Sequence, residues 1–344
     1  MVKYQAKTEP FGAQGLRSIF RSQYSLENQY SIDNNMRKVI GIGETLLDII
    51  FKDNKPMEAV PGGSTFNAIV SLGRVGANAT FVTETGDDHV GGLIRTFLSQ
   101  NNVNTDYVSV RNGWKSPVSL AFLDHDNNAN YTFYRDANTD PVDMQLPEIQ
   151  ADDIVLFGSF YAVSPATRPQ VSALLDRARE CGAIIYYDVN FRPSHRGDVM
   201  KVTPNLIDNL DYADIVRGSR DDFEVLYKKD SAERVYRAET SFYCPRLVYT
   251  DGPHPVTVFS DGGFRKEYPM PQTPTVSTIG AGDNFNAGLI CAMLRYDIRR
   301  ADLERGLTDG EWAKLIESAT AFSADCCAGI YNYVSAEFGE KHRL

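Results

Sequence analysis

The stretch from Ser277 to Gly288, STIGAGDNFNAG, combines small residues with an acid in a pattern that could do chemistry. Gly280, Ala281 and Gly282 precede an apolar helical pattern, so their backbone N–H groups would lie uncovered at a helix start. Such a start favours anions, because its N–H groups are unpaired and the helix dipole is positive there. Asp283 follows directly, and two interpretations are open. It caps the helix, or it accepts a proton from a nucleophile while the N–H groups hold developing phosphate charge.

Further polar residues follow predicted strands, and we expect them at the carboxyl edge of a sheet, where open α/β folds bind ligands. Taken singly, each has a structural explanation as a turn, a cap or a solvated helix residue. Together, the acids and amides would face two turns rich in backbone N–H groups, which suits a polyhydroxylated substrate beside a polyphosphate. The set comprises Asp48, Gly62, Gly63, Asn67, Asp188, Asn190, Arg192, Ser219, Asp222, Thr250, Gly252 and Asp283.

Several catalytic templates are absent from the sequence. It has no G-x-x-x-x-G-K-[ST] loop, no H-E-x-x-H and no G-x-S-x-G, and the run Gly41–Glu44 lacks the third glycine of a dinucleotide fingerprint. These absences disfavour P-loop, metalloprotease, serine-hydrolase and dinucleotide-binding functions.

Short apolar runs alternate with amphipathic stretches from Val39 onward, which predicts an α/β fold. Right-handed crossovers between such strands give a mainly parallel central sheet with helices on both faces, a three-layer arrangement. We expect Ser64 to cap the first helix, and Asp87 or Asp88 to open the second with Leu93 among its inward residues. The predicted strands are 39–43, 79–83, 154–158, 183–189, 214–217 and 246–250, and further helices are 167–181, 203–211 and 220–228.

Two insertions interrupt this alternation and predict a small β-strand lid. One lies at about 49–60 around a turn at Lys52–Pro56, and the other, at about 104–135, contains strand patterns at 118–124 and 131–135. We expect antiparallel strands outside the main sheet. The predicted organisation is a flexible or non-native extension over residues 1–36, with Met36 a possible start, followed by one domain over 37–344 with this discontinuous lid.

Composition disfavours some classes of binding partner and indicates where the protein is located. The chain has 344 residues, 42% of them hydrophobic, and a formal net charge of −10 without a basic block, which disfavours nucleic acid or an anionic membrane surface as a partner. No apolar run approaches the roughly 18–20 residues that span a bilayer, and no secretory signal is evident. The five cysteines lack metal-ligand spacing. We therefore predict a cytoplasmic, reduced, soluble protein.

Two motifs in the right order resemble those of the PfkB/ribokinase family of carbohydrate kinases, and most of all its fructokinase-type members. The first is GGSTFNA at Gly62–Ala68, and the second is the Ser277–Gly288 stretch. GETLLD at Gly43–Asp48, GDD at Gly86–Asp88 and DVNFRP at Asp188–Pro193 support the resemblance, which extends from about residue 38 to the C-terminus. It implies a ribokinase-like three-layer fold and phosphorylation of a sugar by ATP.

The resemblance also implies a role for individual residues. Asp283 would be the base, and the N–H groups of Gly280, Ala281 and Gly282 would be the anion hole for the transferring phosphoryl group. Mg²⁺ would be held largely by water and ATP phosphates. The implied sugar contacts are Asp48, Gly62, Gly63, Asn67 and Arg135, and the implied nucleotide or phosphate contacts are Asn190, Arg192, Ser219, Thr250 and Gly252.

Two positions depart from the family pattern. Ser277 stands where many members have an Asp that supports a monovalent-cation site, so we predict at most weak activation by K⁺. Asp222 stands at the Glu of the N-x-x-E motif, which begins here with Ser219, and it would reach the metal through water on a shorter arm. Neither change affects the base.

Fructose is the first candidate substrate, and ribose, 2-keto-3-deoxygluconate and nucleosides are alternatives. A nucleoside would need aromatic stacking, which Phe122, Phe133 or Tyr161 could supply. A catalytically weak sugar sensor or interaction protein is the alternative from another class, and the intact Asp283 and small-residue turn argue against it. An exposed lid sheet predicts a homodimer through the lids, and lid closure over the sugar would exclude water.

Overall fold

A computed structural model describes residues 36–123, 129–136 and 144–344 of the chain. The predictions about an N-terminal extension and an alternative start at Met36 concern residues 1–35, which lie outside the described residues. Residues 37–344 form one compact unit.

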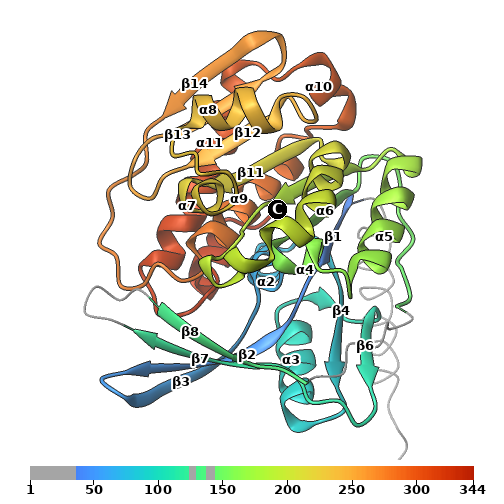
Figure 1. The fold of residues 1–344 in the computed structure, drawn as a ribbon, viewed down its shortest axis with the longest axis vertical. Coiled ribbons are helices and arrows are strands. Elements are labelled where there is room, and N and C mark those ends of the chain that lie inside the picture. The colour runs from blue at the N-terminus through green and yellow to red at the C-terminus, as the bar shows by residue number, and fades with distance from the viewer. Residues whose placement is uncertain (1–35, 124–128, 137–143) are drawn as a thin grey trace, which may run out of the picture. The chain divides into compact units, whose positions relative to one another are not determined.

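A large, mostly parallel sheet runs through this unit (Figure 1). Its strands lie in the order β14-β13-β12-β11-β10-β9-β1-β4-β5, and β6 also pairs with β4. All neighbours are parallel except β12–β13 and β13–β14, which are antiparallel. The strands are β1 (Lys38–Ile42), β4 (Asn78–Gly86), β5 (Val103–Asn104), β6 (Val108–Arg111), β9 (Ile154–Gly158), β10 (Ile184–Asp188), β11 (Ile215–Ser219), β12 (Leu247–Thr250), β13 (Val256–Ser260) and β14 (Phe264–Tyr268).

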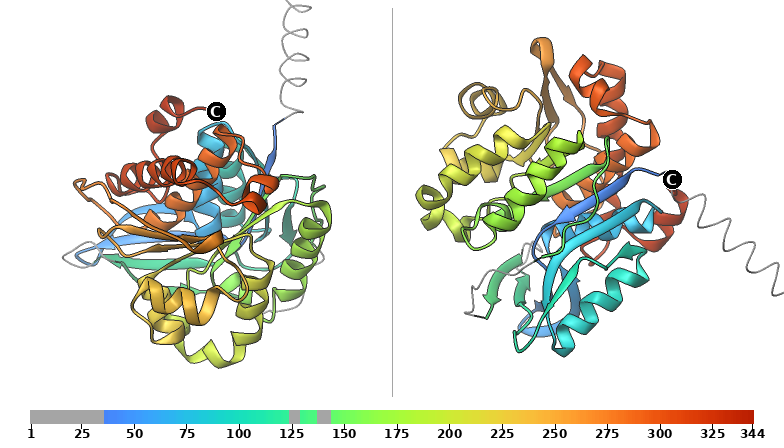
Figure 2. Two further views of the ribbon diagram at one scale, coloured as in Figure 1. Left: turned by 90° about the horizontal axis from the view of Figure 1, so that it is seen from above. Right: turned by 90° about the vertical axis from the view of Figure 1, so that its right-hand side faces the viewer.

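Helices cover both faces of this sheet, which confirms the predicted α/β architecture (Figures 1 and 2). One core packs sheet residues such as Val39 against Phe66 of α2 and Trp312 of α11; the other packs Ile40 against Leu174 of α5 and Leu206 of α6. The helices are α2 (Ser64–Arg74), α3 (His89–Gln100), α4 (Ser159–Val163), α5 (Arg168–Cys181), α6 (Val199–Tyr212), α7 (Arg220–Tyr227), α8 (Ala232–Val235), α9 (Ala281–Arg295), α10 (Arg300–Arg305), α11 (Asp309–Cys327) and α12 (Ala336–Lys341).

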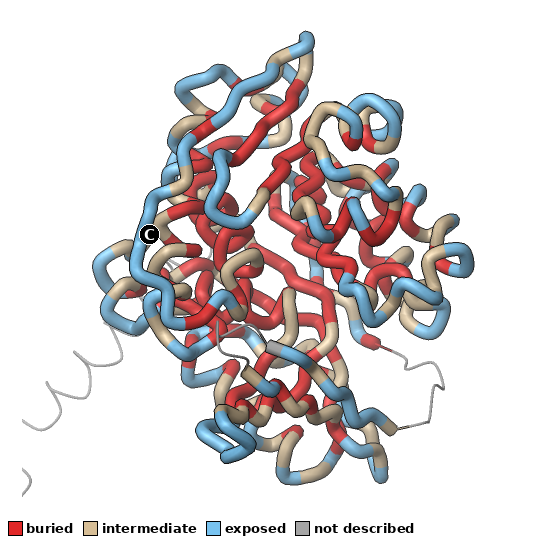
Figure 3. Tube along the Cα trace, turned by 60° about the vertical axis from the view of Figure 1, so that its left-hand side comes forward, coloured by how far each residue is buried: buried red, intermediate tan, exposed pale blue. Residues whose placement is uncertain are grey.

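The sequence of β9, IVLFG, is apolar on both faces. Every residue of β9 is buried, as expected for a central parallel strand, and Figure 3 shows buried chain through the middle of the unit. Two predictions need correction: β13 and β14 were not expected as strands, and Leu93 of α3 is 44% exposed although we placed it inward. None of the helices in the described ranges is long and apolar enough to cross a bilayer.

A second sheet of four strands stands apart from the main one, in the order β3-β2-β7-β8. Its strands are β2 (Leu46–Lys52), β3 (Lys55–Gly62), β7 (Val118–Leu123) and β8 (Ala129–Tyr134). The β2–β3 and β7–β8 pairs are antiparallel as predicted, but β2 and β7 run parallel. The predicted insertion at 104–135 also begins too early, because β5 and β6 pair with β4 in the main sheet.

Candidate functional site

A cavity of about 390 Å³ lies between the second sheet and the starts of two core helices. Asp48 and Tyr131 line it from the second sheet, Ser64 and Asn67 from the start of α2, and Gly280 and Asp283 from the start of α9. This cavity therefore brings the predicted base, Asp283, together with predicted sugar contacts such as Asp48 and Asn67, although these residues are far from Asp283 in the sequence.

Asp283 lies in the first turn of α9 and is 5% exposed. One carboxylate oxygen accepts a hydrogen bond from Ser64 Oγ at 2.8 Å, and the other accepts one from Asn67 Nδ2 at 2.8 Å. Ser64 Oγ accepts in turn from Asn190 Nδ2 at 2.6 Å. A chain of donors thus fixes the carboxylate, and the helix has no side-chain cap, so the capping interpretation of Asp283 finds no support.

Burial raises the pKa of Asp283 above its ordinary value. The hydrogen bonds from Asn67 and Ser64 and the positive charges of Arg192 and Arg217 act in the opposite direction without cancelling that effect. A carboxylate with a raised pKa is a stronger proton acceptor than an exposed one, which is the property that a general base requires.

The turn before α9 depends on small residues. Gly280 is the N-cap in the left-handed region at φ 77°, where only glycine fits without strain, and an added Cβ would lie 2.5 Å from the Asn332 carbonyl oxygen. Within the described residues neither Gly280 N nor Gly282 N has an acceptor, whereas Ala281 N donates to the Thr278 carbonyl over 3.3 Å. Two of the three predicted anion-hole donors are therefore free, and the third is weakly engaged.

Asp48 lies inside β2 of the second sheet, so our placement of this residue at a strand end of the main sheet was wrong. It is 6% exposed and accepts hydrogen bonds from Ser119 Oγ and from Asn332 Nδ2, the latter at 3.1 Å. Burial raises the pKa of Asp48 to about 6, even though both hydrogen bonds lower it. Asp48 is thus a second buried carboxylate in the same cavity.

Gly62 and Gly63 are required by close approaches. A Cβ at Gly62 would meet Asp48 Oδ2 at 2.5 Å, and one at Gly63, where φ is 134°, would meet the Glu44 carbonyl oxygen at 2.3 Å. Gly63 is also the N-cap of α2, which corrects the prediction that Ser64 caps this helix. Ser64 is the first helical residue instead, and its hydroxyl is released to bind Asp283.

The mouth of the cavity carries charged and aromatic side chains. Arg135, which follows β8, forms an ion pair with Glu44 at 2.9 Å and is partly exposed. Exposed Arg192 also lines the cavity. Four aromatic side chains form two stacked pairs there: Tyr131 with Phe133, with ring centroids 5.7 Å apart, and Phe160 with His195, 3.7 Å apart.

Two of the three aromatic residues suggested from sequence lie elsewhere. Phe122 stacks on Phe51 within the second sheet, with ring centroids 4.8 Å apart, and does not line this cavity. Tyr161 lines a neighbouring cavity of about 190 Å³. Phe133 is the residue of the three that reaches the predicted site.

Ser219, Thr250 and Gly252 are not among the residues that line this cavity. They end β11 and β12 or follow them, and of the three it is Thr250 that contacts the buried side chain of Arg217. Its guanidinium donates to Thr250 Oγ1 at 2.7 Å and to Asp188 at 3.1 Å, and an added Cβ on Gly282 would lie 2.9 Å from it. The nucleotide role predicted for the three residues stays a prediction.

Asp222 has a clear structural role. It accepts from Phe191 N at 2.8 Å, and from both Ser219 N and Ser219 Oγ at the start of α7, where the two residues form a capping box. A carboxylate offers about four lone-pair sites, so one remains for a water ligand of a metal. The described residues contain no group of three His, Cys, Asp or Glu side chains that could hold a metal by themselves.

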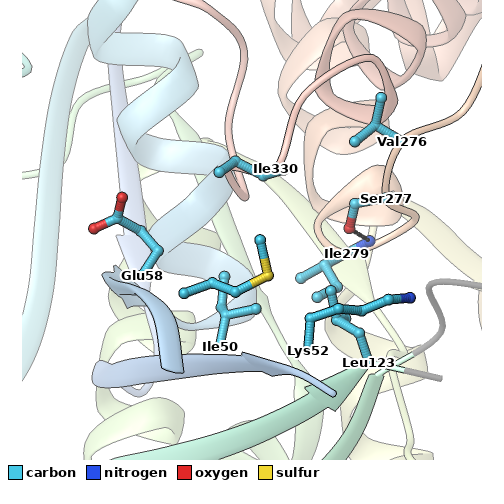
Figure 4. Close-up of a pocket in the computed structure, with 9 residues that line it drawn as sticks. Ile50, Lys52, Glu58, Leu123, Val276, Ser277, Ile279 and Ile330 are labelled. Carbon is cyan, nitrogen blue, oxygen red and sulfur yellow. Dashed lines mark hydrogen bonds between the residues drawn. The ribbon is translucent and has the colours of Figure 1, made fainter. Parts of the chain in front are cut away.

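Ser277 lies at the edge of a smaller apolar slot of about 180 Å³ between the second sheet and the loops at 276–279 and 330 (Figure 4). Its hydroxyl accepts from Ile279 N at 3.2 Å, and the side chain is 3% exposed. The hydroxyl thus shapes the turn that leads into Gly280.

Four residues with contacts in the site were not predicted: Ser64 as a ligand of Asp283, Ser119, Asn332 and Arg217. The GGSTFNA motif could have pointed to Ser64, since a hydroxyl beside two glycines is well placed for polar contacts. Ser119, Arg217 and Asn332 lie in segments whose sequence gave no chemical signal, and only the fold brings them to the site.

The chain is similar in sequence to known proteins. The sequence profile described as "pfkB family carbohydrate kinase" matches residues 36–324. The chain is 25% identical to fructokinase-2 of Zea mays over 276 residues, covering 77% of this chain and 82% of that protein. It is 22% identical to probable fructokinase-4 of Arabidopsis thaliana over 267 residues, covering 74% and 82%.

Solved structures share the fold. A fructokinase from Vibrio cholerae O395, in a fructose-, ADP- and calcium-bound form, has a TM-score of 0.76 at 19% identity, covering 88% of this chain and 96% of that one. An aminoimidazole riboside kinase from Salmonella enterica, complexed with aminoimidazole riboside and an ATP analogue, has a TM-score of 0.75 at 23% identity, covering 87% and 96%.

Proposed function

We propose that this chain, which belongs to the pfkB family of carbohydrate kinases and is therefore a sugar kinase, transfers the γ-phosphoryl group of ATP to a primary hydroxyl of a small sugar. Fructose is the first candidate acceptor. The observation that supports this proposal is the position of Asp283, whose carboxylate is fixed by Ser64 and Asn67 at the start of α9 and shares a cavity with Asp48.

In the proposed reaction Asp283 accepts the proton of the sugar hydroxyl as that oxygen attacks the γ-phosphorus. The O–H bond breaks toward the carboxylate, the new O–P bond forms, and ADP leaves with the electrons of the broken P–O bond. The N–H groups of Gly280 and Gly282, with a weaker contribution from Ala281, hold the charge of the transferring group. Asp48 and Asn67, with the bare backbone at Gly62 and Gly63, orient the sugar hydroxyls.

The nucleotide would approach from the side of Arg192. Its guanidinium lines the cavity and lowers the pKa of Asp283, so its positive charge is felt at the base and would be felt by a phosphate there. Asn190 would contact the phosphates beside it, and Ser219, Thr250 and Gly252 would lie toward the nucleoside. Mg²⁺ would neutralise phosphate charge, held mainly by phosphate oxygens and water, with Asp222 accepting from one water.

The test is ADP release from ATP and Mg²⁺ across a panel of sugars and nucleosides. We expect sugar-dependent turnover that falls by at least about 10²-fold in Asp283→Asn, with sugar binding retained in calorimetry. Asp208→Asn on α6 is the matched control, because it removes a carboxylate from an exposed ion pair outside the cavity and should not change turnover. Undiminished turnover in Asp283→Asn would rule out the assigned base.

A riboside is the second candidate, because stacked aromatic pairs line the cavity mouth. A planar heterocycle could stack on Phe133 or Phe160, whereas a free hexose would gain less from them. Phe133→Leu and Phe160→Leu should then reduce kcat/KM for ribosides more than for fructose. Equal or smaller effects on ribosides would favour the hexose.

We further propose that two copies of the chain associate through their second sheets, which would serve as lids. Side chains alternate along β2, so Asp48 and Ile50 face the core side while Ile49 and Phe51 face outward. The outward face also carries Phe122, which is 37% exposed and stacks on Phe51. Light scattering should give a dimer mass for the native chain and a monomer mass for Phe122→Lys, with Met200→Lys, at a residue 87% exposed on α6, as the control.

A further inference from the structure

We propose that Asn332 is a positioning residue for sugar binding, which holds the Asp48 carboxylate as an acceptor for the substrate hydroxyls. The inference rests on the proposed role of Asp48 as a sugar contact. Asn332 lies between α11 and α12, 1% exposed, and lines the cavity. Its Nδ2 donates to Asp48 Oδ2 at 3.1 Å, across almost the full length of the described chain.

The backbone of Asn332 is fixed without help from its side chain. The Asn332 carbonyl accepts from Asn284 Nδ2 at 2.8 Å, and the same amide also donates to the Gly280 carbonyl at 2.8 Å. Two residues later, Val334 N donates to Ser71 Oγ at 3.1 Å. A substitution of the Asn332 side chain should therefore leave the segment and the start of α9 in place, so its effect can be assigned to Asp48.

The buried amide of Asn332 is energetically unfavourable in one respect, and its hydrogen bond to Asp48 gives a reason for an amide at this position. Within the described residues Asn332 Oδ1 is buried without a partner, and an unpaired buried carbonyl is unfavourable. An apolar side chain would avoid that cost but would remove the donor to Asp48. The absence of a side chain at Gly62 makes room for the pair, because a Cβ there would lie 2.5 Å from Asp48 Oδ2 and 3.2 Å from Asn332 Nδ2.

The charged surroundings make this donor important. Burial raises the pKa of Asp48 most, and the negative charges of Glu44 and Asp283 raise it further. Tyr131 and Tyr333 also lie within electrostatic range of Asp48. Two hydrogen-bond donors, Ser119 Oγ and Asn332 Nδ2, lower the pKa of Asp48. Removing either donor should favour the protonated carboxyl, which would accept hydrogen bonds less well and bind the sugar more weakly.

The test compares Asn332→Leu with the native chain from pH 5 to 8. A hydrogen bond to a charged group corresponds to a shift of about one pH unit, so the pH at which sugar binding weakens should rise by about that amount. The KM for the sugar should then increase, approaching tenfold below pH 6, while kcat at saturating sugar changes little. Ser119→Ala should also raise the pH at which sugar binding weakens. Asn286→Leu should not, because the buried amide of Asn286 pairs with Tyr186 rather than with Asp48.

Urea unfolding supplies a readout that does not depend on activity. The pKa of Asp48 is raised in the folded state, so its ionisation destabilises the fold as pH rises through about 6. Asn332→Leu should increase that penalty, and its loss of stability relative to the native chain should be larger at pH 8 than at pH 5. Equal losses at both pH values, or a KM profile that matches Asn286→Leu, would overturn the proposal. Absence of sugar-dependent turnover in the native chain would instead contradict the proposed function, and the unfolding comparison would still test the Asp48–Asn332 contact.

Discussion

Replacing Gly280 by alanine tests whether the turn before α9 forms the anion hole. An alanine at φ 77° carries a left-handed backbone penalty of roughly 1–2 kcal/mol. The new Cβ would also lie 2.5 Å from the Asn332 carbonyl oxygen and 2.9 Å from its carbon. Ordinary C···O contacts lie near about 3.3–3.6 Å. Because both of these neighbours are backbone atoms, the turn must move by roughly 1 Å.

A movement of that size at donors aimed at a reacting phosphoryl group should lower kcat by about 10²-fold. Steady-state ADP release measures it, and urea unfolding measures stability. Gly182→Ala is the matched control, because Gly182 has a similar φ of 73° after α5 and no atom within 4 Å of an added Cβ. We expect that control to lose roughly 1–2 kcal/mol of stability with unchanged kcat. A kcat for Gly280→Ala within about threefold of the native value would refute the reasoning.

Three further predictions concern the pKa of Asp283, the buried Arg217–Asp188 ion pair and the residue at position 277. Ser64→Ala removes a donor to Asp283 and so raises its pKa, which should move the acid limb of kcat to higher pH in a pH–rate profile. Arg217→Met leaves the Asp188 carboxylate buried without its ion pair, so the free energy of unfolding measured in urea should fall by about 3–5 kcal/mol at pH 8. The loss should be smaller at pH 5, because burial raises the pKa of Asp188 to about 6 and its protonation at pH 5 removes the unpaired charge. Replacing Na⁺ by K⁺ should change turnover little, because Ser277 supplies no carboxylate; a large rate increase would contradict this expectation.

The parts of the site predicted from sequence are those formed by neighbouring residues. The sequence predicts the turn at Gly280–Gly282 and the role of the acid after it, because a helix start, small residues and a charged residue fall within four positions. Ser64 was assigned the wrong role for the same local reason. A serine at a helix start is usually a cap, and only the unusual backbone at Gly63, with φ 134°, shows that the cap is one residue earlier.

The parts that could not be predicted depend on pairing between distant segments. The parallel contact of β2 with β7 follows from how two insertions meet, which no periodicity within either segment encodes. The strand β14, with sequence FRKEY, is charged and mostly exposed, so it resembles a loop until β13 pairs with it. Asn332 reaches Asp48 from the far end of the chain, in a segment with neither apolar period nor motif.

Each of the two buried carboxylates, Asp48 and Asp283, should cause its own loss of activity at low pH, and the two acid limbs of the pH–rate profile should be separable. Burial raises the pKa of both Asp48 and Asp283, and Asp283 contributes to the shift at Asp48. Protonation of Asp48 would weaken sugar binding, whereas protonation of Asp283 would remove the base. Because kcat reports groups in the substrate complex and kcat/KM those in the free enzyme, saturating sugar should remove the first limb and leave the second. A profile in which both limbs vanish together at saturation would mean that the proposed division of labour between sugar contact and base is wrong.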